Sequence, residues 1–163
     1  MATYRDIKGF QVQSVETDPV VNAGSWASGG NLNTGRSRIG GSTQATLTAG
    51  IIFGNGDPPH GATEEYNGTA WSAGGALSIA RRSHFGEGTE YAALVAVGEP
   101  SEKVSTEEYY GETWAAGGNL ITGRFASVGG GTQNSSFAAG GRSSEGNPLS
   151  CTEEYDGSTW SAG

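Results

Sequence analysis

Nine residues recur three times in this chain, and their recurrence constrains the fold more than any other feature. They read TEEYNGTAW at 63–71, TEEYYGETW at 106–114 and TEEYDGSTW at 152–160. The four tryptophans of the chain lie 45, 43 and 46 residues apart. A period of this length is typical of repeat architectures, in which each copy is one supersecondary unit. The sequence therefore predicts three copies of one structural unit.

Other residues keep a fixed order around these segments. A Gly-Gly pair and then an Arg follow each of the first three tryptophans, and a Gly-rich stretch ending in Thr comes next. We interpret the recurring tryptophans, the tyrosines five residues before the last three of them, and the arginines ten residues after the first three as structural positions of the repeat. These positions are Trp26, Trp71, Trp114, Trp160, Tyr66, Tyr109, Tyr155, Arg36, Arg81 and Arg124.

Each unit predicts four short strands joined by Gly-rich turns. The first follows the Arg, and the second is an apolar run, ATLTAGIIFG, YAALVAVG or NSSFAAGG, of the kind that is buried on both faces. TEEY forms the third strand and the Trp segment the fourth. Asn67-Gly68 and Asp156-Gly157 between them are strong hairpin signals, because Gly adopts positive φ without steric cost. The expected fold class is all-β, with three four-stranded antiparallel repeats.

The acidic and basic residues of the repeat allow several interpretations. Alternation along a strand puts Glu64 and Tyr66 on one face and Thr63 and Glu65 on the other. The Glu-Glu pairs are expected to form a solvated strand face; a cation-binding ring and hydrogen bonds to backbone amides of a neighbouring blade are the alternatives. The arginines are expected to pair with a carboxylate or carbonyl from one repeat to the next, with a ligand role as the alternative.

Composition narrows the class of partner. The formal net charge is −8, and no basic run interleaves with aromatic residues, so we expect no nucleic-acid binding. No apolar run approaches transmembrane length, so we expect no membrane insertion. The start of the chain lacks the apolar core of a signal peptide, and the single cysteine, Cys151, offers neither a disulfide framework nor a cysteine metal site.

Nothing in the sequence predicts catalysis. His60 lies in a variable loop and His84 in a strand, in non-equivalent positions without metal-ligand spacing, and we interpret them as a loop and a surface histidine. The Gly-rich segments GEGTE and GGGTQ lack the Lys of a phosphate loop, and no Ser stands in G-x-S-x-G. We therefore expect no enzyme, no cofactor and no metal.

The order of these motifs resembles a known repeat. A period of about 45 residues with Gly-Gly after an apolar strand, then Tyr and then Trp, resembles the kelch-type repeat of β-propellers. Gly140-Gly141, Tyr155 and Trp160 form the clearest copy, whereas Gly50-Ile51 and Gly98-Glu99 stand where the first two copies would carry a double Gly. The repeats also resemble Gly-, Thr- and Asn-rich repeats of virion and tail-associated proteins of tailed phages, marine ones especially. The N-terminal MATYRDIKGFQVQSVETDP resembles the leader of the same proteins.

This resemblance implies a function and a location. The chain is expected to be a non-enzymatic phage virion protein, made in the host cytoplasm and associated with the tail or a tail fibre. There it would mediate assembly, attachment to a host-surface glycan or protein, or both. Two other functions remain as alternatives: a carbohydrate-binding, lectin-like module and an intracellular kelch-type scaffold for protein partners.

The domain organisation leaves a problem of closure. Residues 1–22 are expected to dock on other virion proteins, and 23–163 carry the repeats, at about 26–70, 71–113 and 114–163. Propellers close with four to eight blades, so three blades leave two apolar sheet faces open. A homo-oligomer that completes the propeller is the favoured solution. A β-prism of three sheets and a longer protein with further blades are the alternatives.

The loops after the second strand of each unit, 54–62, 99–105 and 142–151, differ most between repeats and are the expected contact surface. Their candidate contact residues are polar: Asn55, Asp57, His60, Glu99, Glu102, Lys103, Arg142, Glu145 and Asn147.

Overall fold

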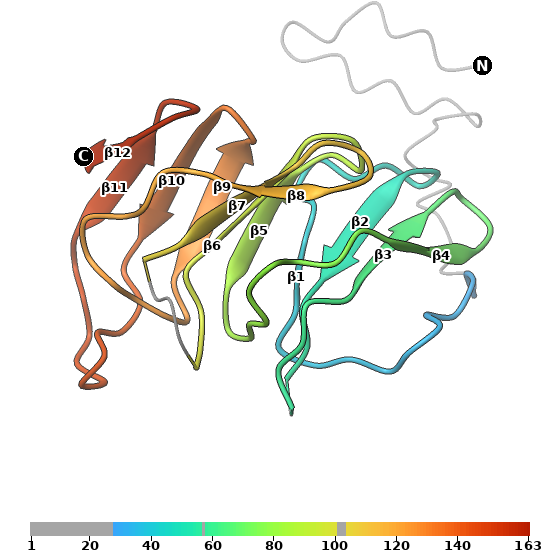
Figure 1. Ribbon diagram of the computed structural model, residues 1–163, viewed down its shortest axis with the longest axis horizontal. Coiled ribbons are helices and arrows are strands. Elements are labelled where there is room, and N and C mark those ends of the chain that lie inside the picture. Colours follow the sequence, from blue (N-terminus) through green and yellow to red (C-terminus); the bar gives the residue numbers. More distant parts are fainter. Residues whose placement is uncertain (1–27, 57, 101–103) are drawn as a thin grey trace, which may run out of the picture.

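The computed structural model describes residues 28–56, 58–100 and 104–163. Within these ranges the chain forms three four-stranded antiparallel sheets and no helix (Figure 1). Each sheet contains four strands that are consecutive in the sequence and hydrogen-bonded in chain order. The prediction of an all-β fold with three four-stranded antiparallel units is confirmed. The N-terminal docking segment, 1–22, and Trp26 lie outside the described residues.

The strands of the three sheets correspond position by position. The first sheet consists of β1 (Gly40–Gly41), β2 (Gly50–Phe53), β3 (Thr63–Tyr66) and β4 (Trp71–Gly74). The second consists of β5 (Phe85–Gly88), β6 (Ala93–Ala96), β7 (Thr106–Tyr109) and β8 (Trp114–Ala116). The third consists of β9 (Val128–Thr132), β10 (Ser135–Ala139), β11 (Thr152–Tyr155) and β12 (Trp160–Ala162).

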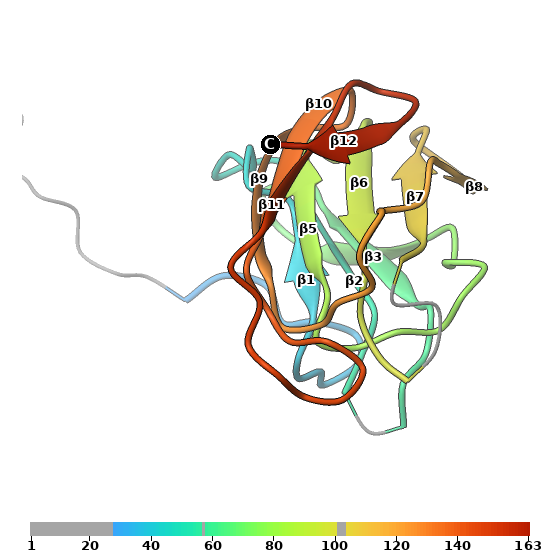
Figure 2. The same cartoon turned by 90° about the vertical axis from the view of Figure 1, so that its left-hand side faces the viewer.

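The sheets form an open row. The first strand of the second sheet, β5, packs beside both β1 and β9, while β1 and β9 make no comparable contact in the described part of the chain. The three sheets thus fan out from their first strands, with the first and third at the two ends (Figures 1 and 2). This is the arrangement of blades in an incomplete propeller. The β-prism that the sequence left open is not adopted.

The sheets and the sequence repeats differ in where they end. The repeats at about 26–70 and 71–113 place each Trp strand at the start of the following unit. In the structure Trp71 pairs with Tyr66, and Trp114 pairs with Tyr109, so each Trp strand is the last strand of the sheet that contains its TEEY segment. The ten or so residues after each Trp strand then link one sheet to the first strand of the next.

The predicted hairpin between TEEY and Trp forms in all three sheets. Asn67 Oδ1 accepts hydrogen bonds from the backbone N–H groups of Thr69 and Ala70, both at 3.0 Å, and Gly68 has φ of 91°. Asp156 makes the corresponding bonds in the third sheet, where the N–H groups of Thr159 and Ser158 lower the pKa of its carboxyl to about 2. The Asn-Gly and Asp-Gly signals therefore act through side-chain capping of a four-residue turn.

The apolar strands are not equally buried. All four residues of β6 are completely buried, as predicted for a strand covered on both faces. In β10, by contrast, Ser136 and Ala138 are buried while Phe137 is 42% exposed. The difference follows from position, because β6 lies in the middle sheet and β10 in an end sheet with one open face.

The arginines and the first Glu of each TEEY segment form one repeated buried cluster. Arg81 Nη2 lies 2.7 Å from Glu107 Oε1, and its Nη1 donates to the carbonyls of Val97 and Ser105 at 3.0 and 3.1 Å. Glu107 also accepts bonds from the N–H and Oγ of Ser78. Equivalent pairs form at the other two repeats: Arg36 with Glu64 and Arg124 with Glu153.

These pairs correct two predictions. The expected solvated face is wrong for Glu64, Glu107 and Glu153, which are at most 3% exposed in their side chains. The arginines pair with carboxylates and carbonyls as predicted, but within a repeat and not from one repeat to the next. A single buried cluster explains both, because a buried carboxylate needs a cationic partner and hydrogen-bond donors.

The second Glu of TEEY connects neighbouring sheets. The hydroxyl of Tyr109 donates to Glu65 of the first sheet, and that of Tyr155 donates to Glu108 of the second at 2.5 Å. Burial, together with these carboxylates, raises the pKa of both tyrosines to about 12. Glu108 is buried, which also contradicts the solvated face. The alternative of hydrogen bonds to backbone amides of a neighbouring blade named other donors, because tyrosine hydroxyls make these bonds between the sheets.

Another correction concerns His84, which is buried and not a surface residue. Its Nε2 accepts a hydrogen bond from the N–H of Gly40 at 2.8 Å, and its ring stacks on Phe53 at 5.7 Å. Burial and the nearby positive charge of Arg81 lower its pKa to about 4. The imidazole is therefore neutral near pH 7 and acts as a packing element between the first and second sheets.

The buried carboxyl group of Glu87 is expected to make the stability of the fold depend on pH. The side chain is completely buried, Ser136 donates to its Oε1, and Oε2 has no partner among the described residues. Burial raises its pKa from 4.5 to about 8. The folded chain then holds a proton that the unfolded chain releases, so stability falls as pH rises from about 4.5 to 8.

Replacing Glu87 with Gln is expected to remove this dependence. Between pH 6.5 and 8 the wild type should lose about 1.5 kcal/mol relative to the variant, as measured by urea unfolding. His84 titrates identically in both proteins and cancels in the comparison. If the free energy of unfolding changed equally with pH in the wild type and in Glu87→Gln, the raised pKa of Glu87 would be contradicted.

Candidate binding pocket and contact loops

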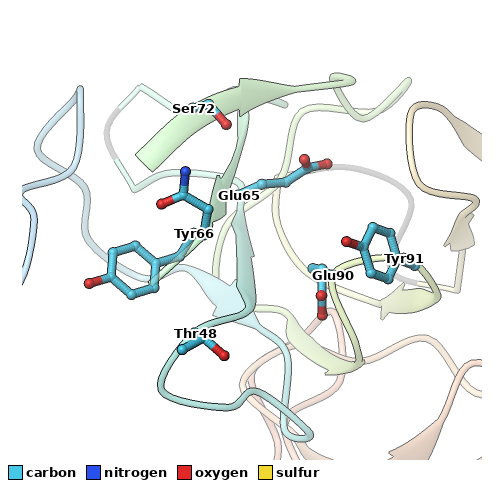
Figure 3. A pocket seen from close by; sticks show the side chains of 7 residues that line it. Thr48, Glu65, Tyr66, Ser72, Glu90 and Tyr91 are labelled. Carbon is cyan, nitrogen blue, oxygen red and sulfur yellow. The ribbon is translucent and has the colours of Figure 1, made fainter. Parts of the chain in front are cut away.

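A pocket of about 300 Å³ lies where the first sheet meets the turn between β5 and β6 of the second. Figure 3 shows the side chains around it, from the β1–β2 turn, from β3 and β4, and from the β5–β6 turn. Its lining residues are polar or aromatic: Thr48, Glu65, Tyr66, Asn67, Ser72, Glu90 and Tyr91.

One residue difference explains why the pocket lies at this junction. At the junction of the second and third sheets, buried Gln133 donates its amide to the carbonyls of Tyr109 and Ala93, at 2.5 and 3.3 Å. Glu90 is the corresponding residue at the first junction, since both directly follow the Thr that ends the Gly-rich stretch. A carboxylate has no N–H groups with which to bind the equivalent carbonyls. Glu90 remains half-exposed beside an open hollow.

Replacing Glu90 with Gln is expected to stabilise the fold by about 1 kcal/mol, because the amide can make the two bonds that Gln133 makes. The reverse change, Gln133→Glu, is expected to cost about 1–3 kcal/mol, because two buried carbonyls lose their donor. Urea unfolding of both variants measures the effects. Equal or lower stability of Glu90→Gln would contradict this explanation of the pocket.

The chemistry of the pocket suits a polar, uncharged or cationic ligand. Glu65 and Glu90 supply carboxylates, while Asn67 and Ser72 supply an amide and a hydroxyl. Tyr91, which is 71% exposed, offers an aromatic face at the rim. Hydroxyl groups of a ligand can donate to the carboxylates while an apolar face stacks on the ring. Among the described residues no lysine or arginine lines the pocket, so this lining offers an anionic ligand no counter-charge.

The sequence predictions missed this pocket, because no residue of its lining was a candidate contact residue. Thr48, Glu65, Ser72, Glu90 and Tyr91 were not among the candidate contact residues. A signal was present in the sequence. The residue after the Thr is Gln in the first and third repeats, at Gln44 and Gln133, but Glu90 in the second. Whether a charged replacement leaves a cavity depends on the packing between sheets, which the repeat pattern does not contain.

The predicted contact residues of the first two loops form local networks. Asn55 Nδ2 lies 2.8 Å from His60 Nε2, so these two residues are brought together. Glu99 pairs with Arg82 at 3.3 Å, and Arg82 also donates to the carbonyl of Gly56 at 3.3 Å. Arg82 thus connects the loop of the first sheet with the loop of the second. Asp57, Glu102 and Lys103 lie outside the described residues.

The third loop is held mainly by bonds within itself. Arg142 Nη1 donates to the carbonyl of Gly146 at 3.0 Å, and the N–H of Ser143 donates to the carbonyl of Asn147 at 2.9 Å. The hydroxyl of Ser143 donates to Glu145 at 2.7 Å. Arg142, Glu145 and Asn147 are exposed and lie near one another in a shaped loop, available for contact.

The pocket and the contact loops lie at opposite ends of the strands. Each contact loop follows the second strand of its sheet, whereas the pocket involves turns after first and third strands. Because neighbouring strands are antiparallel, these two sets of connections emerge at opposite ends. Figure 1 shows the loops after β2, β6 and β10 at its lower edge. The protein therefore has two separate candidate binding surfaces.

The tryptophans have structural positions. Trp160 is 6% exposed and Trp114 is half-buried. Their Nε1 atoms donate to Thr106 and Thr63 of the preceding sheet, each at 3.0 Å. They therefore connect sheets and do not line a shared groove. In the described ranges no group of three His, Cys, Asp or Glu side chains is placed to hold a metal ion, and no helix has the length and hydropathy to cross a membrane.

The structure thus defines a class, an all-β protein of three propeller-like sheets with a polar pocket at one edge and shaped loops at the other. A scan against protein-family models and a search of curated proteins found no match for the chain.

Proposed function

We propose that the chain is a non-enzymatic structural protein of a phage virion, associated with the tail or a tail fibre. Its role there is assembly, attachment to the host surface, or both. The TEEY…Trp repeats and the N-terminal segment support this proposal through their resemblance to tail-associated proteins. The fold agrees with a binding role, because the recurring charged and aromatic residues hold the sheets together and leave the loops and turns for contact.

Labelling of purified virions tests this proposal. Antibodies raised against residues 28–163, applied with gold particles and viewed by electron microscopy, are expected to decorate the tail or its fibres. Mass spectrometry of the same particles is expected to detect peptides of the chain. Particles that lack the chain by both methods would contradict a virion role.

A carbohydrate-binding function is the second candidate, and the pocket at the first junction favours it. Carboxylates from Glu65 and Glu90, the amide of Asn67 and the exposed ring of Tyr91 are the groups that a neutral sugar would use. Sugar binding in this pocket would also supply the chemistry of host attachment, so the two candidates are compatible.

A glycan array with the purified chain tests the second candidate. Binding of a neutral or amino sugar is expected, and Tyr91→Ala should weaken it at least tenfold because the stacking face is lost. Tyr110→Ala is the matched control, since Tyr110 is 59% exposed but does not line the pocket. Equal loss in both variants, or no binding by the wild type, would contradict a sugar site here.

A further inference from the structure

Polar contacts repeat at the two junctions between sheets. At the first, Tyr109 of the second sheet donates to Glu65 of the first, and Trp114 donates to Thr63 at 3.0 Å. At the second, the corresponding pairs are Tyr155 with Glu108, and Trp160 with Thr106. Each sheet therefore presents donors on its N-terminal face, towards the preceding sheet, and acceptors on its C-terminal face, towards the following one.

Apolar contacts repeat in the same way. Phe53, on the C-terminal face of the first sheet, packs against Gly86, where an added Cβ would meet its ring at 2.2 Å. Phe85, on the C-terminal face of the second sheet, packs against Gly129 with the same 2.2 Å separation. Both phenylalanines also meet a Trp ring of the following sheet edge-on: Phe53 with Trp114 and Phe85 with Trp160.

The two end sheets each expose one half of this junction. On the C-terminal face of the third sheet, Val128 is 65% and Phe137 42% exposed, although the corresponding Phe85 and Leu94 of the second sheet are 7% and 0% exposed. On the same face Glu154 is exposed, and its carboxylate has no hydrogen-bond partner in the described part of the chain. This surface has apolar residues and an acceptor at the junction positions, and no sheet of the described chain covers it.

The first sheet exposes the complementary half. Ile52, Tyr66 and Trp71 lie on its N-terminal face and are half-buried, although the corresponding Val95 and Tyr109 are completely buried. The Tyr66 hydroxyl has no partner among the described residues. Trp71 Nε1 donates to the carbonyl of Gly30 at 3.2 Å, as Trp114 does to that of Gly75, but in the described ranges it has no Thr partner like Thr63.

We infer that a second copy of this chain docks head to tail on these two faces. Tyr66 donates to Glu154 of the second copy and Trp71 to its Thr152, while the first sheet covers its Val128 and Phe137. The contact repeats a junction that the chain already makes twice, so its chemistry is complementary without new residues. Two such contacts close two copies into a ring of six sheets, within the four to eight blades of propellers.

Two features oppose this contact: the negative net charge of each copy, and the segment 28–30 that lies on the first sheet. Each copy carries a formal net charge of −8, so association should strengthen as salt screens the repulsion. Gly29 lies near the Tyr66 hydroxyl, as Gly74 lies near that of Tyr109, so Gly163 of the second copy has to displace it. Residues 28–30 are exposed, but their displacement breaks the bond from Trp71 Nε1 to the carbonyl of Gly30 and the packing of Gly30 on the backbone of Thr69.

Sedimentation of the full chain in 0.15 M salt tests the inference. The wild type is expected to form a dimer at micromolar concentration, which dissociates as salt is lowered. Phe137→Asp breaks the C-terminal face and Ile52→Asp the N-terminal face, and each variant alone is expected to be monomeric. Leu47→Asp, at a 93% exposed turn residue outside both faces, is the control and should remain dimeric. Circular dichroism verifies that each variant is folded.

Mixing the two broken variants distinguishes head-to-tail docking from other dimers. A Phe137→Asp chain retains its N-terminal face and an Ile52→Asp chain its C-terminal face, so a mixture can form one intact contact. We expect the mixture to recover a heterodimer, weaker than the wild-type dimer. A monomeric wild type would overturn the inference, as would a dimer formed by either variant alone or a mixture that stays monomeric.

Discussion

Replacing Arg81 with Met is expected to lower the free energy of unfolding by about 3–5 kcal/mol, because it leaves an uncompensated buried charge. Arg81 and Glu107 are each 1% exposed in their side chains. The change also removes the donor to the carbonyls of Val97 and Ser105, which lie in the interior. Urea unfolding followed by tryptophan fluorescence measures the effect.

Two further variants make this prediction specific. Arg82→Met changes the neighbouring residue, whose side chain is 23% exposed and pairs with Glu99, and we expect it to cost less than about 1 kcal/mol. The double variant Arg81→Met/Glu107→Met removes both charges and should be more stable than Arg81→Met alone. A loss for Arg81→Met no larger than that for Arg82→Met would show that the buried cluster does not stabilise the sheet.

Replacing Phe85 with Ala is expected to cost about 3–5 kcal/mol through loss of buried area and the cavity that remains. The Phe85 side chain fills the space between the second and third sheets, against Gly129 and the Trp160 ring. Leu47→Ala, at an exposed turn residue, is the control and should change stability by less than about 0.5 kcal/mol.

The same junction allows a test of coupling. Gly129→Ala places a methyl group 2.2 Å from a Phe85 ring carbon, so it is expected to destabilise the wild type. In the Phe85→Ala background the added methyl group partly fills the cavity, and its cost should disappear or reverse. Additive effects of the two substitutions would mean that Phe85 and Gly129 are not in direct contact.

Much of the fold follows from local sequence signals. The period of the tryptophans, the apolar runs between glycines and the Asn-Gly and Asp-Gly turns identify four strands in each unit, and the sheets contain these strands in that order. These predictions hold because hairpins between consecutive strands depend on a few neighbouring residues. The boundaries of the sheets were harder to predict, because a repeat that recurs in the sequence can be divided into units at any position.

The roles of the polar residues depended on contacts that are distant in the sequence. Glu64 and Glu65 are adjacent, yet one pairs with Arg36, 28 residues away, and the other accepts from Tyr109, 44 residues away. A solvated face was a reasonable expectation for an acidic strand, but stacking of sheets buries both faces of the middle one. The pocket beside Glu90 arises from the same stacking, since it lies where an amide fills the space at the next junction.

The sequence by itself determined the unit: four strands, their order and the residues that recur in each copy. Only the tertiary structure decided what those residues do, because packing one sheet on the next joins Tyr and Trp to Glu and Thr of the preceding sheet, while Arg and the first Glu of each TEEY segment form buried pairs within each repeat. It also decided that the first and last sheets differ from the middle one. Phe137 and Tyr66 occupy repeat positions whose counterparts are buried at the junctions. Phe137 is exposed and Tyr66 only half-buried, because no neighbouring sheet of the described chain covers them.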